Sequence, residues 1–178
     1  VLLDSVSEKR KGDKKIGSTG RGISPSYTDL TMRRALRVGN IFQNDFKKQY
    51  ETLRDEHKKI LKNIFQYNVN NKKFQKELLE NEKKFWQGVE FLRSLSIKNS
   101  AELVEKILSH ENKAIAEGAQ GVMLDVRFGN YPFVTSSHTI AGGVATGLGI
   151  PPSWIGGAIG ICNAYATKVG EGPFSTAL

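Results

Sequence analysis

A glycine-rich loop near the start of the chain carries groups that bind phosphate in proteins. Residues 17–22 read Gly-Ser-Thr-Gly-Arg-Gly, which places two hydroxyls and one guanidinium among three glycines. Glycine lets backbone N–H groups approach an anion closely, while hydroxyls and Arg add strong hydrogen bonds. The loop lacks the Gly-Lys-Ser/Thr ending of a Walker A motif. A phosphate-binding loop and an ordinary turn are therefore both open interpretations of these residues.

Two later segments also carry polar groups among glycines. Residues 117–121 read Glu-Gly-Ala-Gln-Gly, and the Gln120 amide can donate and accept hydrogen bonds, as a purine edge requires. The residues alone favour a simpler interpretation, a glycine turn with a solvent-facing Gln. Residues 131–138 bring three hydroxyls together, which is typical of an anion site or of a capped strand end. His138 has no second His or Cys at metal-ligand spacing, so no zinc site is predicted.

Local patterns predict the elements that position these segments. Residues 8–15 read as a solvated loop or hairpin tip, and the glycines and proline of residues 16–25 are not typical of a helix. A helix is predicted from about Asp29. Lys/Glu-rich helices with apolar residues at helical spacing follow over residues 46–95, with a break at residues 68–71.

The second half of the chain is predicted to contain one more helix and short strands. Asn99 with Glu102 three residues later resembles a capping box that opens a helix through His110. Residues 113–116 and 122–126 are predicted to be short strands. A strand followed by a loop is where open α/β sheets bind ligands, and Gln120 lies in such a loop.

The charge is confined to one part of the chain. The 178 residues carry a formal charge of +8, yet residues 118–178 hold 12 of the 18 glycines and only four charged groups, which cancel. The 40 residues from 128 to 167 contain no Asp, Glu, Lys or Arg, but glycines and prolines interrupt them too often for a membrane helix. We therefore expect a buried, loop-rich region that other parts of a protein cover. The single cysteine, Cys162, excludes an internal disulfide and favours a reducing compartment.

The basic helices raise the possibility of RNA binding. Acidic residues are interleaved among the basic ones throughout, for example over residues 77–84. Such a mixture is typical of a solvated helix face. A basic RNA-binding piece is therefore only the weakest alternative.

Taken in order, these segments resemble adenylosuccinate synthetase. The motifs that carry the resemblance keep the family's order and lie at residues 14–27, 33–39, 117–121, 124–125, 129–137, 141–149 and 164–174. Residues 40–112 match only in helical character. The first residue is Val, and the family's N-terminal phosphate loop, aspartate-binding loop and guanine-recognition motif have no counterpart. We therefore expect the middle of a longer protein, inactive by itself.

The resemblance implies an α/β fold, part of a large sheet domain related to the P-loop GTPases with an inserted helical subdomain. Residues 1–39 would form the loop that binds the phosphate of inosine monophosphate (IMP) and a dimer-contact helix. Residues 40–112 would form the helical subdomain. Residues 113–178 would form the sheet and the glycine-rich loops of the nucleotide site. All three would belong to one domain of the longer chain.

The resemblance also implies an activity in purine nucleotide biosynthesis. In the family, GTP phosphorylates the 6-oxygen of IMP, and the amine of L-aspartate then displaces that phosphate to give adenylosuccinate, with Mg²⁺ assisting. GTP would be the co-substrate, and Mg²⁺ would bind mainly to parts outside this segment. The expected partners are IMP, aspartate, GTP and a second copy in a cytoplasmic homodimer, with no membrane and no nucleic acid.

Four residues match the family's IMP contacts. Thr19 and Thr135 match hydroxyls that hold the 5′-phosphate, and Arg33 matches an arginine that reaches the phosphate in the partner subunit. Gln120 matches the residue that contacts the base and its 6-phosphoryl group. No catalytic acid or base and no metal ligand is expected within the segment.

Several positions depart from the family pattern. Arg127 reverses a charge that is often Asp, which would affect dimer or loop ionic contacts near Gln120. The other departures are Ser18 for Thr, Ser24 for Gly, His138 for Asn, Lys168 for Arg, and residues 175–178, where Ala177 replaces a usual Glu. A noncatalytic module that keeps the IMP contacts or the dimer surface is therefore the main alternative function.

Overall fold

The computed structural model describes residues 1–110, 112–167 and 170–174, and the chain divides into two compact units. The first unit consists of residues 1–15 and 19–97, and the second of residues 16–18 and the chain from residue 98 onward. The three-part division at residues 39 and 112 stays a prediction. Lys168 and residues 175–178, which include predicted departures from the family pattern, lie outside the described residues.

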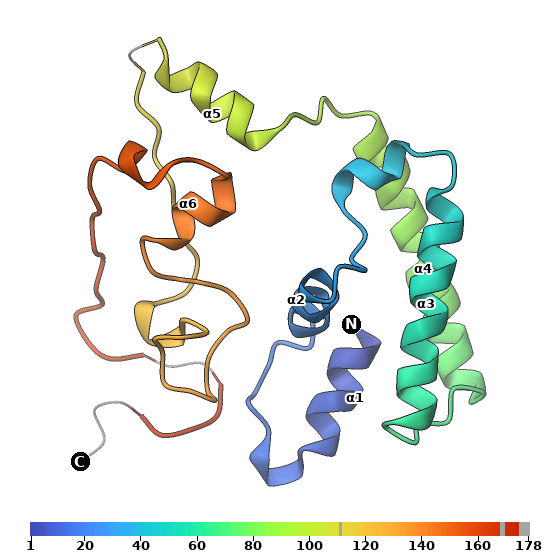
Figure 1. Cartoon of the computed structure of the whole chain (residues 1–178). Helices are drawn as coiled ribbons and strands as arrows, with labels where there is room; N and C mark the ends of the chain where they lie inside the picture. The colour runs from blue at the N-terminus through green and yellow to red at the C-terminus, as the bar shows by residue number, and fades with distance from the viewer. Residues whose placement is uncertain (111, 168–169, 175–178) are drawn as a thin grey trace. The chain divides into compact units, whose positions relative to one another are not determined.

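The first unit is helical (Figure 1). Its elements are α1 (Leu2–Arg10), the 3-10 helix η1 (Gly12–Lys14), α2 (Ile23–Thr31), the 3-10 helix η2 (Val38–Phe42), α3 (Phe46–Asn63) and α4 (Lys72–Arg93). The predicted break between the two long helices is confirmed. The Asn71 side chain caps α4 by accepting a hydrogen bond from the Lys73 backbone N–H at 2.8 Å, which favours a new helix start there.

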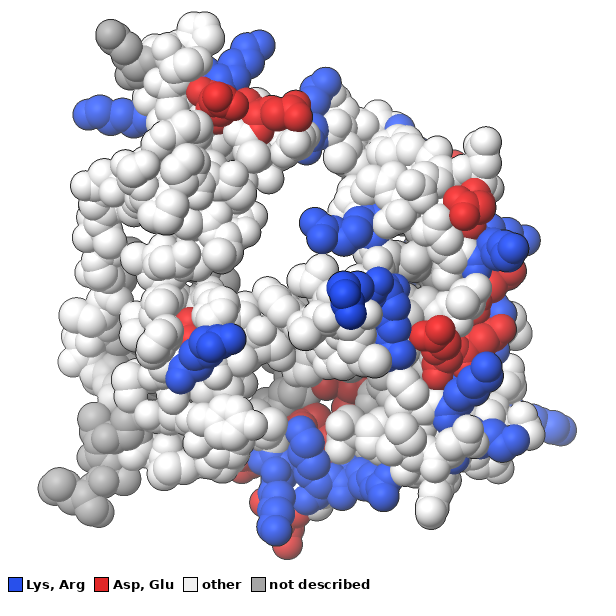
Figure 2. Space-filling model, in the orientation of Figure 1, with Lys and Arg blue, Asp and Glu red and all other residues white. Residues whose placement is uncertain are grey.

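Aromatic side chains pack α3 against α4. Tyr50 stacks on Phe85 with ring centroids 4.6 Å apart, and Phe46 meets Trp86 edge-on at 5.8 Å. Phe46 belongs to the buried core together with Ile41 and Val89. Burying a side chain of this size stabilises the fold by about 2–3 kcal/mol. The opposite faces carry interspersed Lys, Arg, Asp and Glu, as Figure 2 shows over these helices and as the charge pattern predicts.

Two sequence predictions in the first unit are wrong. Residues 8–15 are not all loop, because α1 extends to Arg10 and η1 covers Gly12–Lys14. The second helix begins at Ile23 and not near Asp29, since Gly22 takes a left-handed conformation (φ 85°) that starts the helix and Pro25 is tolerated in its first turn.

The second unit contains short helices joined by long loops. Its elements are α5 (Ser100–Leu108), the 3-10 helix η3 (Val122–Leu124), α6 (Gly143–Leu148) and the 3-10 helix η4 (Pro152–Trp154). The predicted Asn99 cap is confirmed, because its side-chain oxygen accepts a hydrogen bond from the Ala101 N–H at 3.1 Å. The loop-rich character expected beyond residue 118 is also present, but Ile159 and Ile161 are almost fully exposed within this chain.

The expectation of an α/β fold with a sheet is wrong for the described residues, which contain helices and irregular loops but no strand. A strand is stable only where a neighbouring strand pairs with its backbone N–H and C=O groups. Residues 113–116 have no such neighbour among the described segments, and Ile115 is 97% exposed. Residues 122–124 instead form a tight turn, because the Leu124 N–H donates to the Gly121 carbonyl at 2.9 Å.

Within the described ranges, no helix combines the length and the apolar character that crossing a membrane requires.

Candidate functional site

The glycine-rich loop of residues 17–22 is held at both ends. At its start, the Glu171 N–H donates to the Ile16 carbonyl at 3.0 Å, and Gly17 (φ 78°) lies so close that an added Cβ would be 2.8 Å from the Glu171 nitrogen. At its end, the buried Asp4 carboxylate accepts a hydrogen bond from the Gly22 N–H at 2.9 Å. Between these anchors the Thr19 side chain is exposed and accessible to a ligand.

Arg33 occupies a backbone position that favours glycine. Helix α2 ends in a Schellman motif, in which the Arg33 N–H donates to the Leu30 carbonyl and the Arg34 N–H to the Asp29 carbonyl, both at 3.0 Å. Arg33 is the left-handed residue of this motif (φ 61°), a conformation that costs about 1 kcal/mol or more for a residue with a Cβ. The exposed Arg33 side chain is therefore kept at a position where glycine would be the relaxed choice.

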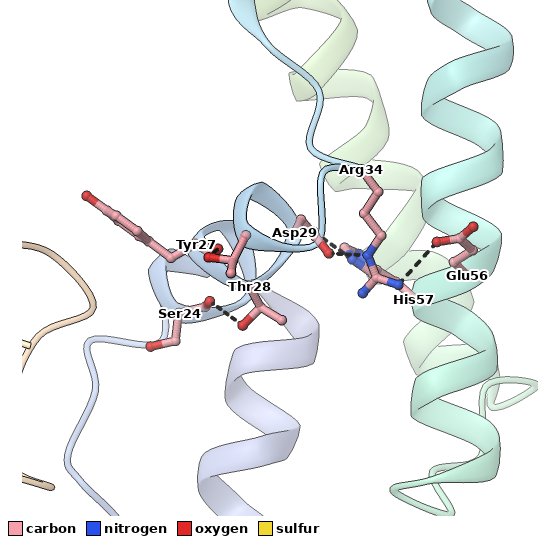
Figure 3. Close-up of polar contacts among 8 residues, drawn as sticks. Ser24, Tyr27, Thr28, Asp29, Arg34, Glu56 and His57 are labelled. Carbon is pink, nitrogen blue, oxygen red and sulfur yellow. Dashed lines mark hydrogen bonds and ion pairs between the residues drawn. The ribbon is translucent and has the colours of Figure 1, made fainter. Parts of the chain in front are cut away.

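Arg34, the next residue, is fixed by two carboxylates (Figure 3). Its Nε donates to Asp29 Oδ1 at 2.8 Å, and its Nη1 donates to Glu56 Oε2 of α3 at 3.3 Å. His57 Nε2 also lies 2.9 Å from Asp29 Oδ2. The ring is not oriented for a hydrogen bond to this oxygen.

A pocket of about 410 Å³ lies beside this network. Arg33 and Arg34 line it together with residues of α3, among them Lys48, Gln49 and Glu56. The Arg33 side chain therefore lies at a solvent-accessible pocket lined by polar and charged groups. The Arg34 side chain is instead hydrogen-bonded to Asp29 and Glu56.

In the second unit, a buried carboxylate organises the loop that contains Gln120 and Thr135. Asp125 is fully buried, and its Oδ1 accepts hydrogen bonds from the backbone N–H groups of Arg127 at 2.8 Å and Phe128 at 3.1 Å. Its Oδ2 accepts one from the Thr139 N–H at 2.7 Å. His138 Nδ1 lies 3.4 Å from the same oxygen, so a residue that departs from the family pattern faces this carboxylate.

These hydrogen bonds set the charge state of Asp125. Burial raises the pKa of its carboxyl, because a desolvated charge is unfavourable. Four backbone N–H groups stabilise the anion and outweigh burial, so the pKa lies well below the ordinary value; they belong to Arg127, Phe128, Thr139 and Ile140. At neutral pH the loop is therefore built around a charged carboxylate.

The same loop holds the predicted ligand residues. The Thr139 hydroxyl donates to the Gly121 carbonyl at 2.9 Å, directly after Gln120, and the Thr135 N–H donates to the Leu124 carbonyl at 2.8 Å. Gln120 is exposed and, like Arg33, has a left-handed backbone (φ 64°), while Thr135 is half-buried.

Of the four predicted ligand residues, Thr19 and Arg33 belong to the first unit, and Gln120 and Thr135 to the second. Their convergence on one nucleotide stays a prediction. Sequence reasoning missed the two organising carboxylates. Asp125 has a recognisable signal, since an Asp that accepts N–H groups two and three residues later is typical of a turn. The contact of Asp29 with His57 has no recognisable signal in the sequence, because His57 belongs to the later helix α3.

The described residues do not fit a metal ion. Among them no group of three or more His, Cys, Asp or Glu side chains could hold one. We therefore assign no Mg²⁺ ligand among the described residues.

Comparisons with known proteins agree on one family. The family model described as adenylosuccinate synthetase matches residues 1–178. The adenylosuccinate synthetase of Christiangramia forsetii is 48% identical over 177 residues, and that of Bacteroides fragilis is 42% identical over the same length, in both cases over 99% of this chain and 40% of the relative. A structure of fully ligated adenylosuccinate synthetase from Plasmodium falciparum matches with a TM-score of 0.81 and 35% identity, covering 97% of this chain and 39% of that one. The chain thus spans about 40% of the length of the curated relatives it matches.

Proposed function

This chain belongs to the adenylosuccinate synthetase family, and from that premise we propose that it supplies IMP contacts and part of the dimer interface to an enzyme of purine nucleotide biosynthesis. The enzyme joins IMP and L-aspartate to form adenylosuccinate, with GTP as the phosphoryl donor. The observation that carries the proposal is the 42–48% identity over nearly the whole chain.

The proposed chemistry divides into two steps. GTP transfers its γ-phosphoryl group to the 6-oxygen of IMP, which turns a poor leaving group into phosphate. The amine of aspartate then attacks C6, and the C6–O bond breaks as phosphate leaves. Mg²⁺, bound mainly by parts of the enzyme outside this segment, would assist the phosphoryl transfer.

Within this scheme, the chain's own residues bind and orient IMP. The hydroxyls of Thr19 and Thr135 donate hydrogen bonds to the 5′-phosphate, and the Arg33 guanidinium reaches the phosphate bound by the partner subunit. Gln120 contacts the base and its 6-phosphoryl group. The exposure of Thr19, Arg33 and Gln120 supports these roles, as does the left-handed backbone at Arg33 and Gln120. A hydrogen bond to a charged group contributes about 1.5–3 kcal/mol.

The test is IMP binding and product formation by the full-length protein, with and without GTP and Mg²⁺. Replacing Thr135 by Val removes the hydroxyl at nearly constant volume, and we expect it to weaken IMP binding about tenfold or more. The Thr135→Ser variant keeps the hydroxyl and should bind IMP almost as the wild type does. Equal affinity in the Val and Ser variants would contradict the assignment of Thr135.

The same experiment also tests the main alternative, a noncatalytic module. A full-length protein that binds IMP but forms no adenylosuccinate would be a noncatalytic IMP-binding module. One observation favours this noncatalytic alternative. His138, at a position where the family usually has Asn, contacts the buried Asp125 carboxylate.

A further inference from the structure

Asp29 binds the residue that follows Arg33 in two ways. Its backbone carbonyl accepts the Arg34 N–H at 3.0 Å, which closes the Schellman motif, and its carboxylate Oδ1 accepts Arg34 Nε at 2.8 Å. Main chain and side chain of one residue therefore act on the same turn. Arg33 is the left-handed residue inside that turn.

The Asp29 carboxylate also fastens this turn to α3. Its second oxygen, Oδ2, lies 2.9 Å from His57 Nε2, and Arg34 in turn reaches Glu56 at 3.3 Å. Asp29 is only 5% exposed, and a buried carboxylate keeps its charge only where cationic or donor groups surround it. In Figure 3 the Asp29 and Arg34 side chains point toward each other between α2 and α3.

The conformation of Arg33 needs such support. A residue with a Cβ disfavours the left-handed region, so neighbouring contacts must hold it there. The Arg33 N–H contributes its own hydrogen bond to the Leu30 carbonyl at 3.0 Å. The side-chain contacts that hold the turn belong to Arg34, since the Arg33 side chain is exposed and lines the pocket beside α3.

We infer that Asp29 is a positioning residue for Arg33: by fixing Arg34, it holds the turn that directs the Arg33 guanidinium toward the phosphate of IMP. This inference rests on the proposed role of Arg33. Asp29 itself touches no nucleotide, and its effect on IMP passes through Arg33.

The experiment is a double-mutant cycle in the full-length enzyme, with IMP affinity, KM and kcat as readouts. The variants are Asp29→Asn, Arg33→Ala and the double variant. Asp29→Asn keeps the shape of the side chain but removes the charge that Arg34 and His57 face. Asp55→Asn is the matched control, because Asp55 also pairs with a neighbouring Arg at 3.1 Å but is 56% exposed.

We expect Asp29→Asn to raise the KM for IMP roughly tenfold with kcat nearly unchanged, since residues in one network couple strongly and a binding contact contributes equally before and during the reaction. In the Arg33→Ala background the same Asp29 substitution should change the KM less than about twofold. Asp55→Asn should behave as the wild type. A merely structural role would instead lower kcat through loss of active enzyme and leave the KM in place.

The outcomes separate this inference from the proposed function. If Arg33→Ala leaves IMP affinity unchanged, the proposed role of Arg33 fails and the inference with it. If Arg33→Ala weakens IMP binding but Asp29→Asn does not, or its effect is the same with and without Arg33, only the positioning role is overturned. Should Asp29→Asn not fold, Arg34→Lys takes its place in the cycle, because Lys keeps the charge but lacks the Nε donor, and the same results support or overturn the inference.

Discussion

Asp125 Oδ2 accepts a hydrogen bond from the Thr139 backbone N–H at 2.7 Å, so one buried carboxylate joins two points of the chain that are 14 residues apart. Gln120 lies just outside this closed segment and Thr135 lies within it. Thr135 therefore lies in a loop that one carboxylate closes. Gln120 is connected to that loop through the next residue, Gly121, whose carbonyl accepts a hydrogen bond from the Thr139 hydroxyl at 2.9 Å.

The Asp125 carboxylate should make stability depend on pH. Its pKa is lowered in the folded protein, so its stabilising contribution is present above the unfolded value of about 3.9 and is lost as pH falls toward the folded value. We expect Asp125→Asn to lower the urea midpoint at pH 7, and the gap to the wild type to narrow as pH falls below about 4. Exposed Asp13→Asn should show no such gap. A gap of constant size across this pH range would contradict the prediction.

Local sequence signals could predict helices and caps but not the long-range contacts. The Asn99 cap and the break at residues 68–71 depend on neighbouring residues, and both were predicted correctly from the sequence. The Asn71 cap is equally local but was not predicted. The prediction of strands at residues 113–116 and 122–126 was wrong. Their residue types are compatible with a strand, but a strand also needs a neighbouring strand to pair with, and the local sequence does not show whether one is present. The start of α2 was missed because Gly22 and Pro25, which usually interrupt helices, here begin one.

The candidate site shows the same division. The resemblance could indicate Thr19, Arg33, Gln120 and Thr135, since their types and spacing lie in short motifs. The carboxylates that hold their loops depend on contacts across the fold, such as Asp29 with His57 and Asp4 with Gly22. Sequence spacing carries no signal for pairs of this kind.

The two adjacent arginines should differ in their effect on IMP. Arg33 is exposed, whereas Arg34 is held by Asp29 and Glu56. We expect Arg33→Ala to weaken IMP binding by the full-length protein by roughly tenfold or more, because the proposed charge-assisted contact to phosphate is lost. Arg34→Ala loosens the turn but keeps the Arg33 guanidinium, so it should weaken IMP binding about as much as Asp29→Asn does and less than Arg33→Ala does. Its effect on thermal stability should be the larger of the two, because the contacts with Asp29 and Glu56 are lost. Isothermal titration with IMP measures the first, and equal affinities in the two variants would refute the assignment.

The left-handed backbone of Arg33 should also affect the free energy of unfolding. Arg33→Gly and Arg33→Ala remove the same guanidinium, but glycine adopts φ 61° without a steric penalty. We expect the Gly variant to be about 1 kcal/mol more stable than the Ala variant, while both bind IMP equally poorly. At Gly39, whose φ is not positive, the comparison runs between the wild-type glycine and Gly39→Ala, and the Ala variant should be the more stable. A more stable Ala variant at position 33 would mean that the left-handed turn is not retained.

Gly129 should tolerate no side chain. A Cβ added there would lie 2.4 Å from the Met123 carbonyl oxygen and 2.6 Å from that of Asp125, so the backbone of the Asp125 loop would have to move. We expect Gly129→Ala to destabilise the protein by about 1–3 kcal/mol and to weaken IMP binding. Gly156→Ala, where the added atom meets open space, is the control. Thermal unfolding and IMP titration of both variants test this, and a Gly129→Ala protein as stable as the control would show that the loop is not tightly closed.

Tyr50 should titrate at unusually high pH. Burial and the neighbouring Glu82, which accepts a hydrogen bond from the Tyr50 hydroxyl at 3.1 Å, raise the Tyr50 pKa from 10.0 to about 12, although Arg54 opposes the shift. A raised pKa means that the contribution of Tyr50 to stability is present below pH 10 and is lost as pH rises toward 12. Tyr50→Phe should therefore cost about 1 kcal/mol at neutral pH, with a smaller cost above pH 10. Subtracting its ultraviolet titration curve from that of the wild type isolates the Tyr50 transition. Tyr165→Phe, which removes the hydroxyl of a 76% exposed side chain, provides the comparison. A Tyr50 transition near pH 10 would contradict the burial of its hydroxyl beside Glu82.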